Sequence, residues 1–261
     1  MDKTLIIFLL ILFLSFSFIN KSLPNLFLYR DFCNPSNSFL PAAQFYSSDK
    51  KISSFFNGQL IYYKKNISPY KYDSVFPDII VYKSESKYIG FTNILYPEEK
   101  ININEQIEFN DNFFHSFIIE NKIFLNPLKY LKPSISSSVS IINVYYLNEE
   151  DVAVAFRQNY KNNIIPILIY TYSTYLSGKF AYISNVYNIE IYLDDEIIYE
   201  RKLDTISKKK IIELISTSSK PQFIKYIISN VSDGEHILKV RVYDFSGNFK
   251  EIQKKFNVKS Y

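Results

Sequence analysis

The sequence predicts an all-β protein, and three observations carry that prediction. Tyrosine and phenylalanine occur 23 times each among the 261 residues, whereas glycine occurs only five times. Aromatic and β-branched residues are enriched in strands, and few segments carry the alanine, leucine, glutamate and lysine mixture that favours helices. Short apolar runs alternate with turn signals along most of the chain, which is typical of strands and hairpins. Hydrophobic residues make up 47% of the chain, which is enough for a sizeable core.

The N-terminus carries an uncharged apolar run, TLIIFLLILFLSFSFI, at residues 4–19. A helix of this run spans about 24 Å at about 1.5 Å per residue, slightly short for a membrane span. We therefore expect a hydrophobic helix within residues 1–24, either a signal-peptide core or a short uncleaved anchor. The absence of an A-x-A-like cleavage site favours the anchor. Both alternatives export the rest of the chain to the periplasm or cell envelope, and the anchor would hold it at the inner membrane.

Residues 25–38 have the composition of a linker into the fold, and residues 39–132 are expected to form a first β domain. An Asn57-Gly58 pair between two β-like runs predicts a hairpin. Further turns between strands are expected at residues 84–86 and 120–122.

Lys132-Pro133 followed by SISSS predicts a domain boundary. Residues 139–261 are then expected to form a second β domain. There NIEIYLDDEIIYERKL alternates across Asp194-Asp195, as a two-residue hairpin should. Regular strand spacing predicts a sandwich. Residues 207–228 are ambiguous, because KKKIIELIST has the composition of a short helix.

The net charge gives no support to nucleic-acid binding, and the single cysteine gives none to an internal disulfide. The net charge of +4 is thinly spread, which gives no argument for nucleic-acid binding. The densest basic run, residues 208–210, fits a solvated turn better than a polyanion contact. Cys33 has no second cysteine for an internal disulfide, and a buried or incidental cysteine fits its neighbours better than lipid attachment.

The two histidines, His115 and His236, are too few for a histidine-rich zinc site, which needs three protein ligands. His115 lies among apolar residues, so a core histidine is the default interpretation and a single metal ligand the alternative. His236 lies beside a turn and is expected at the surface or at the rim of the core. The acidic run Asp194, Asp195 and Glu196 is expected to be a solvated hairpin tip rather than a calcium site, which needs six or more oxygens.

The stretch FFHSFIIENKIFLNPLKYL, residues 113–131, resembles the closing motif of lysostaphin-type zinc metallopeptidases, the bacterial peptidoglycan endopeptidases. That family has an H-x-H-F-E-I strand and a later Asn-Pro. Without gaps, Phe113 stands on the first histidine and His115 on the second, which is a zinc ligand in the family. Asn126-Pro127 stands on the closing Asn-Pro.

The same ungapped register places FLPAA on the family's H-x-x-x-D zinc motif, with Phe39 in place of the histidine and Ala43 in place of the aspartate. KYIGFTNIL resembles the strand that carries the other catalytic histidine, and Asn93 occupies that place. The segment at residues 178–207 is similar to the β-sandwich that follows the peptidase domain in some envelope members. The resemblance covers most of residues 39–261 and depends on order and spacing, because no single motif is intact.

The resemblance implies a compact antiparallel lysostaphin-like β domain followed by an immunoglobulin-like β-sandwich. Of the family's three metal ligands only His115 remains, and neither catalytic histidine does. Phenylalanine and alanine carry no lone pair for a metal, so we predict a pseudo-peptidase without a metal or other cofactor. The vestigial site positions are Phe39, Ala43, Asn93, Phe113 and His115. A retained groove, also lined by Phe91, would either bind a ligand or be filled as core.

We therefore expect a non-catalytic cell-envelope protein that acts by binding. Its partner would be peptidoglycan or an envelope protein such as a working hydrolase or a division or secretion component. The N-terminal segment would contact the membrane, and no nucleic acid is expected. Two alternatives remain open at this point: an active peptidoglycan hydrolase with an atypical site, and a structural, adhesin-like β module.

Overall fold

The structure is a computed structural model, and it describes residues 23–30, 32, 42–64, 78–207 and 223–259. Every regular element in these residues is a strand except η1 (Pro127–Lys129), a short 3-10 helix. The all-β prediction is therefore confirmed for this part of the chain. Among the described residues, no helix has the length and hydrophobicity needed to cross a membrane. The expected N-terminal hydrophobic helix lies outside the described residues.

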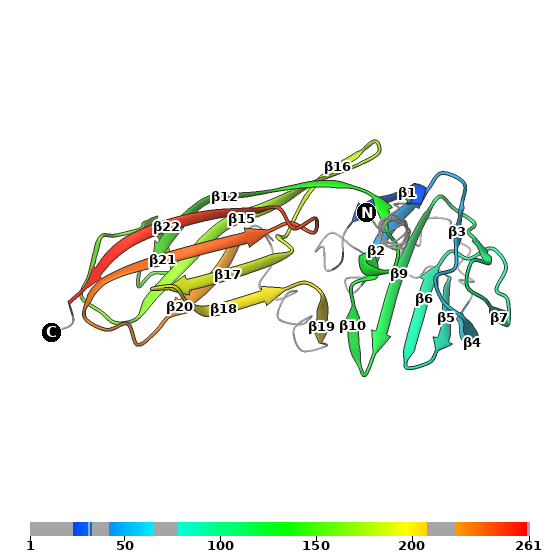
Figure 1. Cartoon of the computed structure of the whole chain (residues 1–261), viewed down its shortest axis with the longest axis horizontal. Helices are drawn as coiled ribbons and strands as arrows, with labels where there is room; N and C mark the ends of the chain where they lie inside the picture. The colour runs from blue at the N-terminus through cyan, green and yellow to red at the C-terminus, as the bar shows by residue number, and fades with distance from the viewer. Residues whose placement is uncertain (1–22, 31, 33–41, 65–77, 208–222, 260–261) are drawn as a thin grey trace, which may run out of the picture.

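A ten-stranded sheet forms the first of two lobes (Figure 1). In spatial order its main strands are β11 (Pro133–Ser134), β1 (Leu23–Arg30), β2 (Ala43–Ser47), β9 (Phe113–Glu120), β6 (Lys87–Thr92), β5 (Ile79–Ser84), β4 (Gly58–Lys64) and β7 (Lys100–Ile101). β10 (Ile123–Leu125) pairs with β9, and β19 (Thr205–Ser207) pairs with β10. All pairs are antiparallel except β1 with β11. Beside this sheet, β3 (Lys51–Ser53) pairs with β8 (Gln106–Glu108).

Phenylalanine side chains dominate the core of the first lobe. Phe114 of β9 stacks on Phe109 at 4.0 Å between ring centroids, and Phe45 of β2 lies 5.4 Å from Phe114. Phe91 of β6 lies 6.4 Å away on the same side. Strand side chains alternate between the two faces of a sheet, so these rings define a core face. The opposite face of β2 and β9 carries a different set of side chains, which is described with the candidate site.

The second lobe consists of two five-stranded sheets that share one core. One sheet contains β13 (Ala153–Ala155), β12 (Ser136–Leu147), β15 (Ile165–Ser177), β16 (Phe180–Ser184) and β20 (Phe223–Ile228). The other contains β14 (Asn159–Tyr160), β22 (Phe249–Val258), β21 (Gly234–Tyr243), β17 (Asn188–Leu193) and β18 (Glu196–Lys202). Apolar side chains from both sheets meet between them, among them Val144, Ile167, Ile191 and Val240. The second half of the chain is therefore a pair of packed sheets, as the strand spacing predicts.

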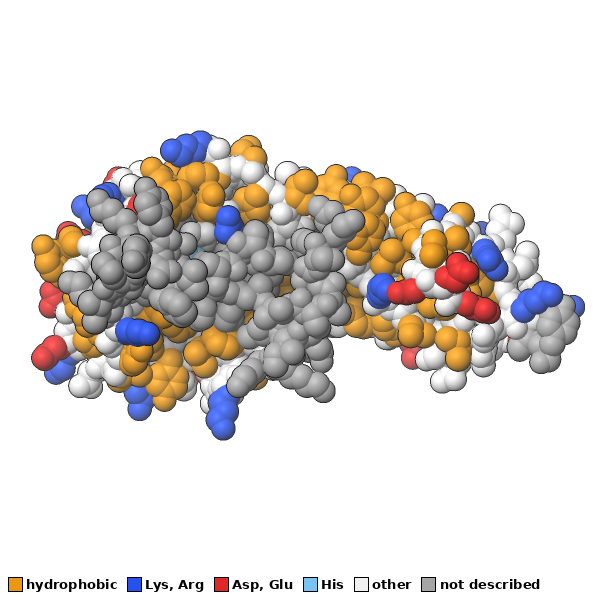
Figure 2. All heavy atoms as spheres, turned by 180° about the vertical axis from the view of Figure 1, so that it is seen from behind, with side chains coloured by type: hydrophobic (Ala, Val, Ile, Leu, Met, Phe, Trp, Pro, Cys, Tyr) orange, Lys and Arg blue, Asp and Glu red, His pale blue; other side chains and the backbone are white. Residues whose placement is uncertain are grey.

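The surface of the second lobe is partly apolar. The sheet that contains β15 exposes Ile142, Leu176, Ile183 and Ile227, each about half exposed. Seen from behind, hydrophobic side chains gather on this lobe where it meets the first (Figure 2).

The hairpin of β15 and β16 fastens the second lobe to the first. β15 pairs with β20 over residues 165–170 and with β16 over residues 173–177. Tyr175 of β15 is buried in the core of the first lobe. The backbone N–H of Leu28 donates to Ser177 Oγ at 2.8 Å, and Ser177 Oγ donates to the carbonyl oxygen of Ser134. The hairpin is thus hydrogen-bonded to both β1 and β11.

A second connection runs through β10, which pairs with the central strand β9. β19 follows β18 in the chain, yet it pairs with β10, with Phe124 opposite Ile206. Asn126, the residue before η1, donates its side-chain amide to Leu203 O at 2.9 Å, and its backbone N–H donates to Asp204 O at 2.8 Å. Asn126 therefore holds the second half of the chain against the first sheet.

Several turns form where the sequence predicts them. Asp194 and Asp195 have φ of 50° and 69°, as a two-residue type I′ hairpin requires. Asn121 and Lys122 have φ of 50° and 64° between β9 and β10. The boundary at Lys132-Pro133 lies just before the chain passes from the first sheet, which it leaves after β11, to the second lobe, which begins with β12.

Two predictions about strands differ from the structure. The Asn57-Gly58 hairpin is wrong, because β3 pairs with β8 while β4 pairs with β5 and β7. The chain turns earlier, where Ser54 Oγ donates to Phe56 O and accepts the Phe56 N–H. Residues 25–30 belong to β1 rather than to a linker, because β2 and β11 supply its hydrogen-bond partners. In the ambiguous segment, residues 223–228 form β20, and residues 208–222 lie outside the described residues.

His236 is buried, with 7% of its surface exposed, rather than at the surface. Its Nδ1 lies 2.6 Å from Asp194 Oδ2, and its Nε2 lies 2.8 Å from Ser232 O. Burial lowers the pKa of His236, but the hydrogen bonds to Asp194 and Ser232 and the charge of Asp194 outweigh it, so the net pKa is raised. Two acceptors favour the protonated ring, in which both nitrogens donate.

Asp194→Asn is expected to destabilise the protein at pH 5.5 and to cost much less at pH 9. A histidine with a raised pKa stabilises the fold fully below its unfolded pKa of about 6.5, and this contribution is lost as the pH rises through the folded pKa. Asparagine tolerates the left-handed backbone, so the turn itself should persist. Urea denaturation at the two pH values measures the difference. Asp195→Asn is the matched control, because Asp195 is exposed and contacts Lys239 instead; an equal pH dependence in both variants would contradict this assignment.

Candidate functional site

β2, β9 and β6 are neighbours in the centre of the first sheet and bring several predicted site positions close together. Gln44 lies opposite His115, and Tyr46 lies opposite Phe113. Asn93 directly follows β6. Phe39 lies outside the described residues.

Asn93 and Phe113 are in direct contact. The side-chain amide of Asn93 donates to the carbonyl oxygen of Phe113 at 3.0 Å. Asn93 has a φ of 64°, a left-handed conformation that asparagine tolerates better than most residues. Its own carbonyl oxygen accepts the backbone N–H of Asn110 at 2.7 Å. Asn93 therefore positions the start of β9, which is a structural role.

His115 is buried, with 7% of its surface exposed. Its backbone N–H donates to Thr92 Oγ1 at 2.9 Å, and its Nδ1 lies 3.4 Å from the same hydroxyl. Burial and, to a smaller extent, the positive charge of Arg30 together lower the pKa of His115 to about 4. The imidazole is therefore neutral at neutral pH.

Ala43 does not lie on the same face of the sheet as His115. It pairs with Ser116 and is part of the phenylalanine core, as is Phe91. Because strand side chains alternate, the β2 residue beside His115 is Gln44. The Oε1 atom of Gln44 is buried and has no hydrogen-bond partner among the described residues. The ungapped register places Ala43 on β2, and the strand pairing shows that Gln44 is the residue of β2 that faces His115.

A zinc ion does not fit the side chains that the structure describes around His115. Zinc sites in proteins use histidine nitrogen, cysteine sulfur and carboxylate oxygen. The described residues contain no group of three or more histidine, cysteine, aspartate or glutamate side chains that could hold a metal. The polar side chains near His115 include the Thr92 hydroxyl and the Gln44 amide, which are weak zinc donors.

An aromatic cluster lies next to this position, and no sequence motif predicts it. It comprises Tyr29 of β1, Tyr46 of β2, Phe113 of β9 and Phe180 of β16. Phe113 lies 4.9 Å from Tyr29 and 5.1 Å from Tyr46 between ring centroids, mostly edge to face. Phe180 lies 5.2 Å from Tyr29 and 5.1 Å from Tyr46. The cluster joins the two lobes, because Phe180 comes from β16 and the other three rings come from the first sheet.

Two cations lie over this cluster. Lys179 Nζ is 5.1 Å from the centre of the Tyr46 ring, and Arg30 Cζ is 5.2 Å from the centre of the Tyr29 ring. Both distances are within the range of cation–π attraction, about 6 Å.

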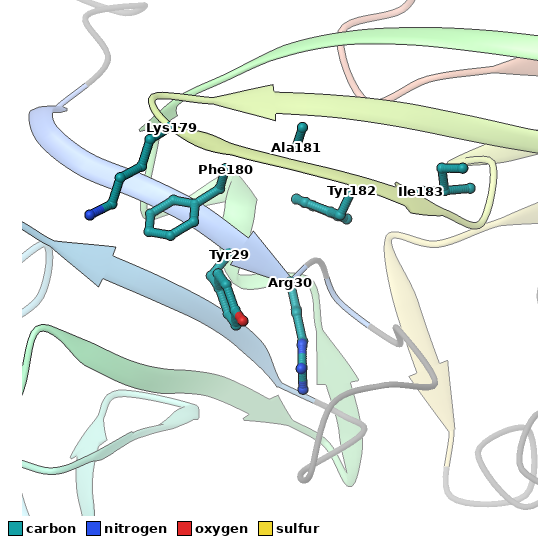
Figure 3. Close-up of a pocket in the computed structure, with 7 residues that line it drawn as sticks. All are labelled: Tyr29, Arg30, Lys179, Phe180, Ala181, Tyr182 and Ile183. Carbon is teal, nitrogen blue, oxygen red and sulfur yellow. The ribbon is translucent and has the colours of Figure 1, made fainter.

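A pocket of about 380 Å³ opens at the same place (Figure 3). Its described walls are Tyr29 and Arg30 of β1 and residues 179–183 of the β15–β16 hairpin. The only charged side chains among them are Arg30 and Lys179. The sequence holds little signal for this pocket, because its two walls come from segments about 150 positions apart that no motif links.

No protein-family model, curated protein or solved structure matches this chain. The function of the site is therefore inferred from the chain's own residues and from the motif resemblance.

The stability of the protein is expected to fall as the pH is lowered from 6.5 towards 4. The unfolded chain protonates His115 near pH 6.5, whereas the folded chain protonates it only near pH 4. A histidine with a lowered pKa contributes stability that is complete above the unfolded pKa and lost below it, here at most about 3 kcal/mol. Urea denaturation between pH 4 and 8 measures this slope. The change in the free energy of unfolding with pH should be smaller in His115→Gln than in the wild type. Below pH 6 it should be the same in His236→Gln as in the wild type. An equal slope in the wild type and in His115→Gln would contradict the assignment to His115.

Proposed function

We propose that this protein is a non-catalytic component of the cell envelope, derived from a lysostaphin-type peptidoglycan endopeptidase, and that it acts by binding. The observation that carries the proposal is the role of three side chains at the positions aligned with the family's site. Asn93 holds β9 through its amide, Phe113 belongs to the aromatic cluster, and His115 is buried and neutral. Each of the three supports the fold or an apolar surface.

The chemistry of the family's reaction supports the same proposal. Zinc peptidases need a metal that activates water and a general base within hydrogen-bond reach of it. Of the aligned positions only His115 carries an imidazole, and its surroundings offer a hydroxyl and an amide as further donors. These side chains suit neither part of the reaction.

The immunoglobulin-like character of the second lobe and the envelope location belong to the same proposal. Two packed sheets with a shared core agree with a sandwich module. The apolar run at residues 4–19 would export the chain and hold it at the membrane. The partner would be peptidoglycan or an envelope protein, such as an active hydrolase or a division or secretion component.

Two measurements on the purified full chain test the proposal. A zymogram on purified cell walls, with and without a chelator, should show no cleavage, while an active endopeptidase on the same gel does. Co-sedimentation with purified sacculi, or crosslinking in native membranes, should show binding. Cleavage that the chelator abolishes would overturn the proposal, and so would a lack of any partner in both binding experiments.

A further inference from the structure

We propose that the outer face of the sheet that contains β15 is a dimer interface, on which a second copy of this chain packs. This surface, the β15 face, consists of the even-numbered residues of β15, from Pro166 to Leu176, and their neighbours on β12, β16 and β20. Strand side chains alternate, and the odd-numbered residues Ile165, Ile167 and Ile169 are fully buried in the core. A dimer goes beyond the proposed function, which concerns other partners.

The two outer faces of the second lobe differ in charge. The sheet of β17, β21 and β22 carries charged side chains outward, among them Lys239, Arg241 and Glu251. In the described strands of the other sheet, Lys225 is the only charged residue, and it forms an ion pair with Asp151. A sheet face that meets water is usually polar. The β15 face therefore has the composition of a surface that becomes covered.

Large apolar side chains lie at both ends of the β15 face. At one end Ile227 is 60% exposed, and Ile164, directly before β15, is 48% exposed. At the other end Leu176 and Ile183 are each 52% exposed. Figure 2 shows hydrophobic side chains gathered on the second lobe beside the first. Contiguous apolar patches of more than a few hundred Å² mark interaction sites on soluble proteins.

Three aromatic rings lie midway between these ends. Phe223 of β20 stacks on Tyr170 of β15 at 4.7 Å between ring centroids, and Tyr172 lies 6.3 Å from Tyr170. Tyrosine and phenylalanine are enriched in the cores of protein–protein interfaces, where charged residues are depleted. The residues that dominate affinity usually lie near the centre of an interface. The three rings would form that centre, with the aliphatic side chains around it.

The size of the β15 face suits a dimer. β12 lies along one side of β15, and β20 and β16 follow each other along the other side. At about 4.8 Å between strands and about 3.3 Å per residue, this face covers roughly 600 Å² in projection. A standard interface takes about 800 Å² of accessible surface from each partner, and protruding side chains raise the accessible area above the projected one. Homodimer interfaces are also more apolar than other interfaces.

The strand register makes the β15 face self-complementary. Ile227 lies opposite Pro166, four residues before Tyr170, and Ile183 lies opposite Thr174, four residues after it. A twofold axis across the strands at Tyr170 therefore places Ile227 of one copy against Ile183 of the other. Symmetric dimers use one self-complementary patch in this way. A foreign partner is usually selected in part by complementary charge, which this face does not offer.

Sedimentation equilibrium of the purified full chain measures the mass of the protein alone when the solvent density matches that of the detergent. The wild type is expected to have twice the mass of one chain. Ile183→Lys and Ile227→Glu each place a charge in the interface, and each should raise the dissociation constant of the dimer at least about tenfold.

The combined variant tests the twofold arrangement. Its new positive charge at position 183 would face the new negative charge at position 227 of the second copy. It should therefore dimerise more tightly than either single variant. Ile237→Lys is the control, because Ile237 is 41% exposed on β21 of the other sheet, and it should leave the dimer unchanged. Unchanged far-ultraviolet circular dichroism would show that the variants remain folded.

The contrary results are distinct. A monomeric wild type, or a dimer that neither single variant weakens, would overturn the assignment of the β15 face. A combined variant no tighter than the single ones would overturn the twofold arrangement. If the wild type is monomeric and the single variants lose binding to sacculi or to an envelope protein, the face serves a foreign partner. The dimer proposal then fails while the proposed function stands. Chelator-sensitive cleavage by a dimeric wild type would reject the proposed function and leave the dimer in place.

Discussion

Phe114→Ala is expected to lower the free energy of unfolding by about 3–5 kcal/mol, the usual cost of removing a fully buried phenylalanine. Phe114 is 0% exposed and lies on the central strand β9. Its ring stacks on Phe109 with an interplanar angle of 9°, and Phe45 and Phe91 pack beside it. Alanine would leave a cavity in the middle of this stack, because neighbouring strands prevent the rings from closing it.

Urea denaturation with circular dichroism measures the loss. Tyr96→Ala is the control, because Tyr96 is 68% exposed and its removal should change stability by no more than about 0.5 kcal/mol. Similar losses for the two variants would contradict a core centred on Phe114.

Gly90→Ala is expected to be strongly destabilising only while Phe117 is present. The two residues lie opposite each other on β6 and β9. A Cβ atom at position 90 would lie 1.9 Å from Cζ of Phe117, so the phenyl ring would have to move away from its place over Gly90. Phe117 is 5% exposed, which leaves its ring little room to move. Overpacking of this kind costs about 1–3 kcal/mol and sometimes more.

A double-mutant cycle isolates this contact. Phe117→Ala alone should cost about 3–5 kcal/mol. In that background Gly90→Ala should cost little or nothing, because the clash is gone and alanine suits a strand better than glycine. Additive costs in the double variant would show that the glycine is needed for another reason.

Some turns could be predicted from the sequence, because the residues that determine their conformation lie within the turn and its two flanking strands. Asp194-Asp195 and Asn121-Lys122 combine residues of turn propensity with alternating strands on both sides, and both pairs adopt left-handed backbone conformations. Asn57-Gly58 carries an equally strong signal but forms no hairpin. The partners of the flanking strands, β8 and β5, come from later in the chain, and their pairing outweighs the local preference.

The candidate site could be predicted only in part for a related reason. The motif resemblance identifies β6 and β9, and the structure places Asn93, Phe113 and His115 close together there. A one-residue change of register reverses the side-chain direction in a strand, so the alignment alone could not choose between Ala43 and Gln44. The pocket depends on a contact between residues 149 positions apart, for which a single sequence holds no signal.

The strand β19 also sets the order in which this chain can fold during its synthesis. The outer edge of β10 receives its partner only when Thr205–Ser207 have left the ribosome. Until then the first sheet has an open edge, and Tyr175, which helps to fill its core, is also missing for much of that time. Open sheet edges invite pairing with other chains. The N-terminal half is therefore vulnerable to aggregation, and in need of chaperones, until most of the protein has been made.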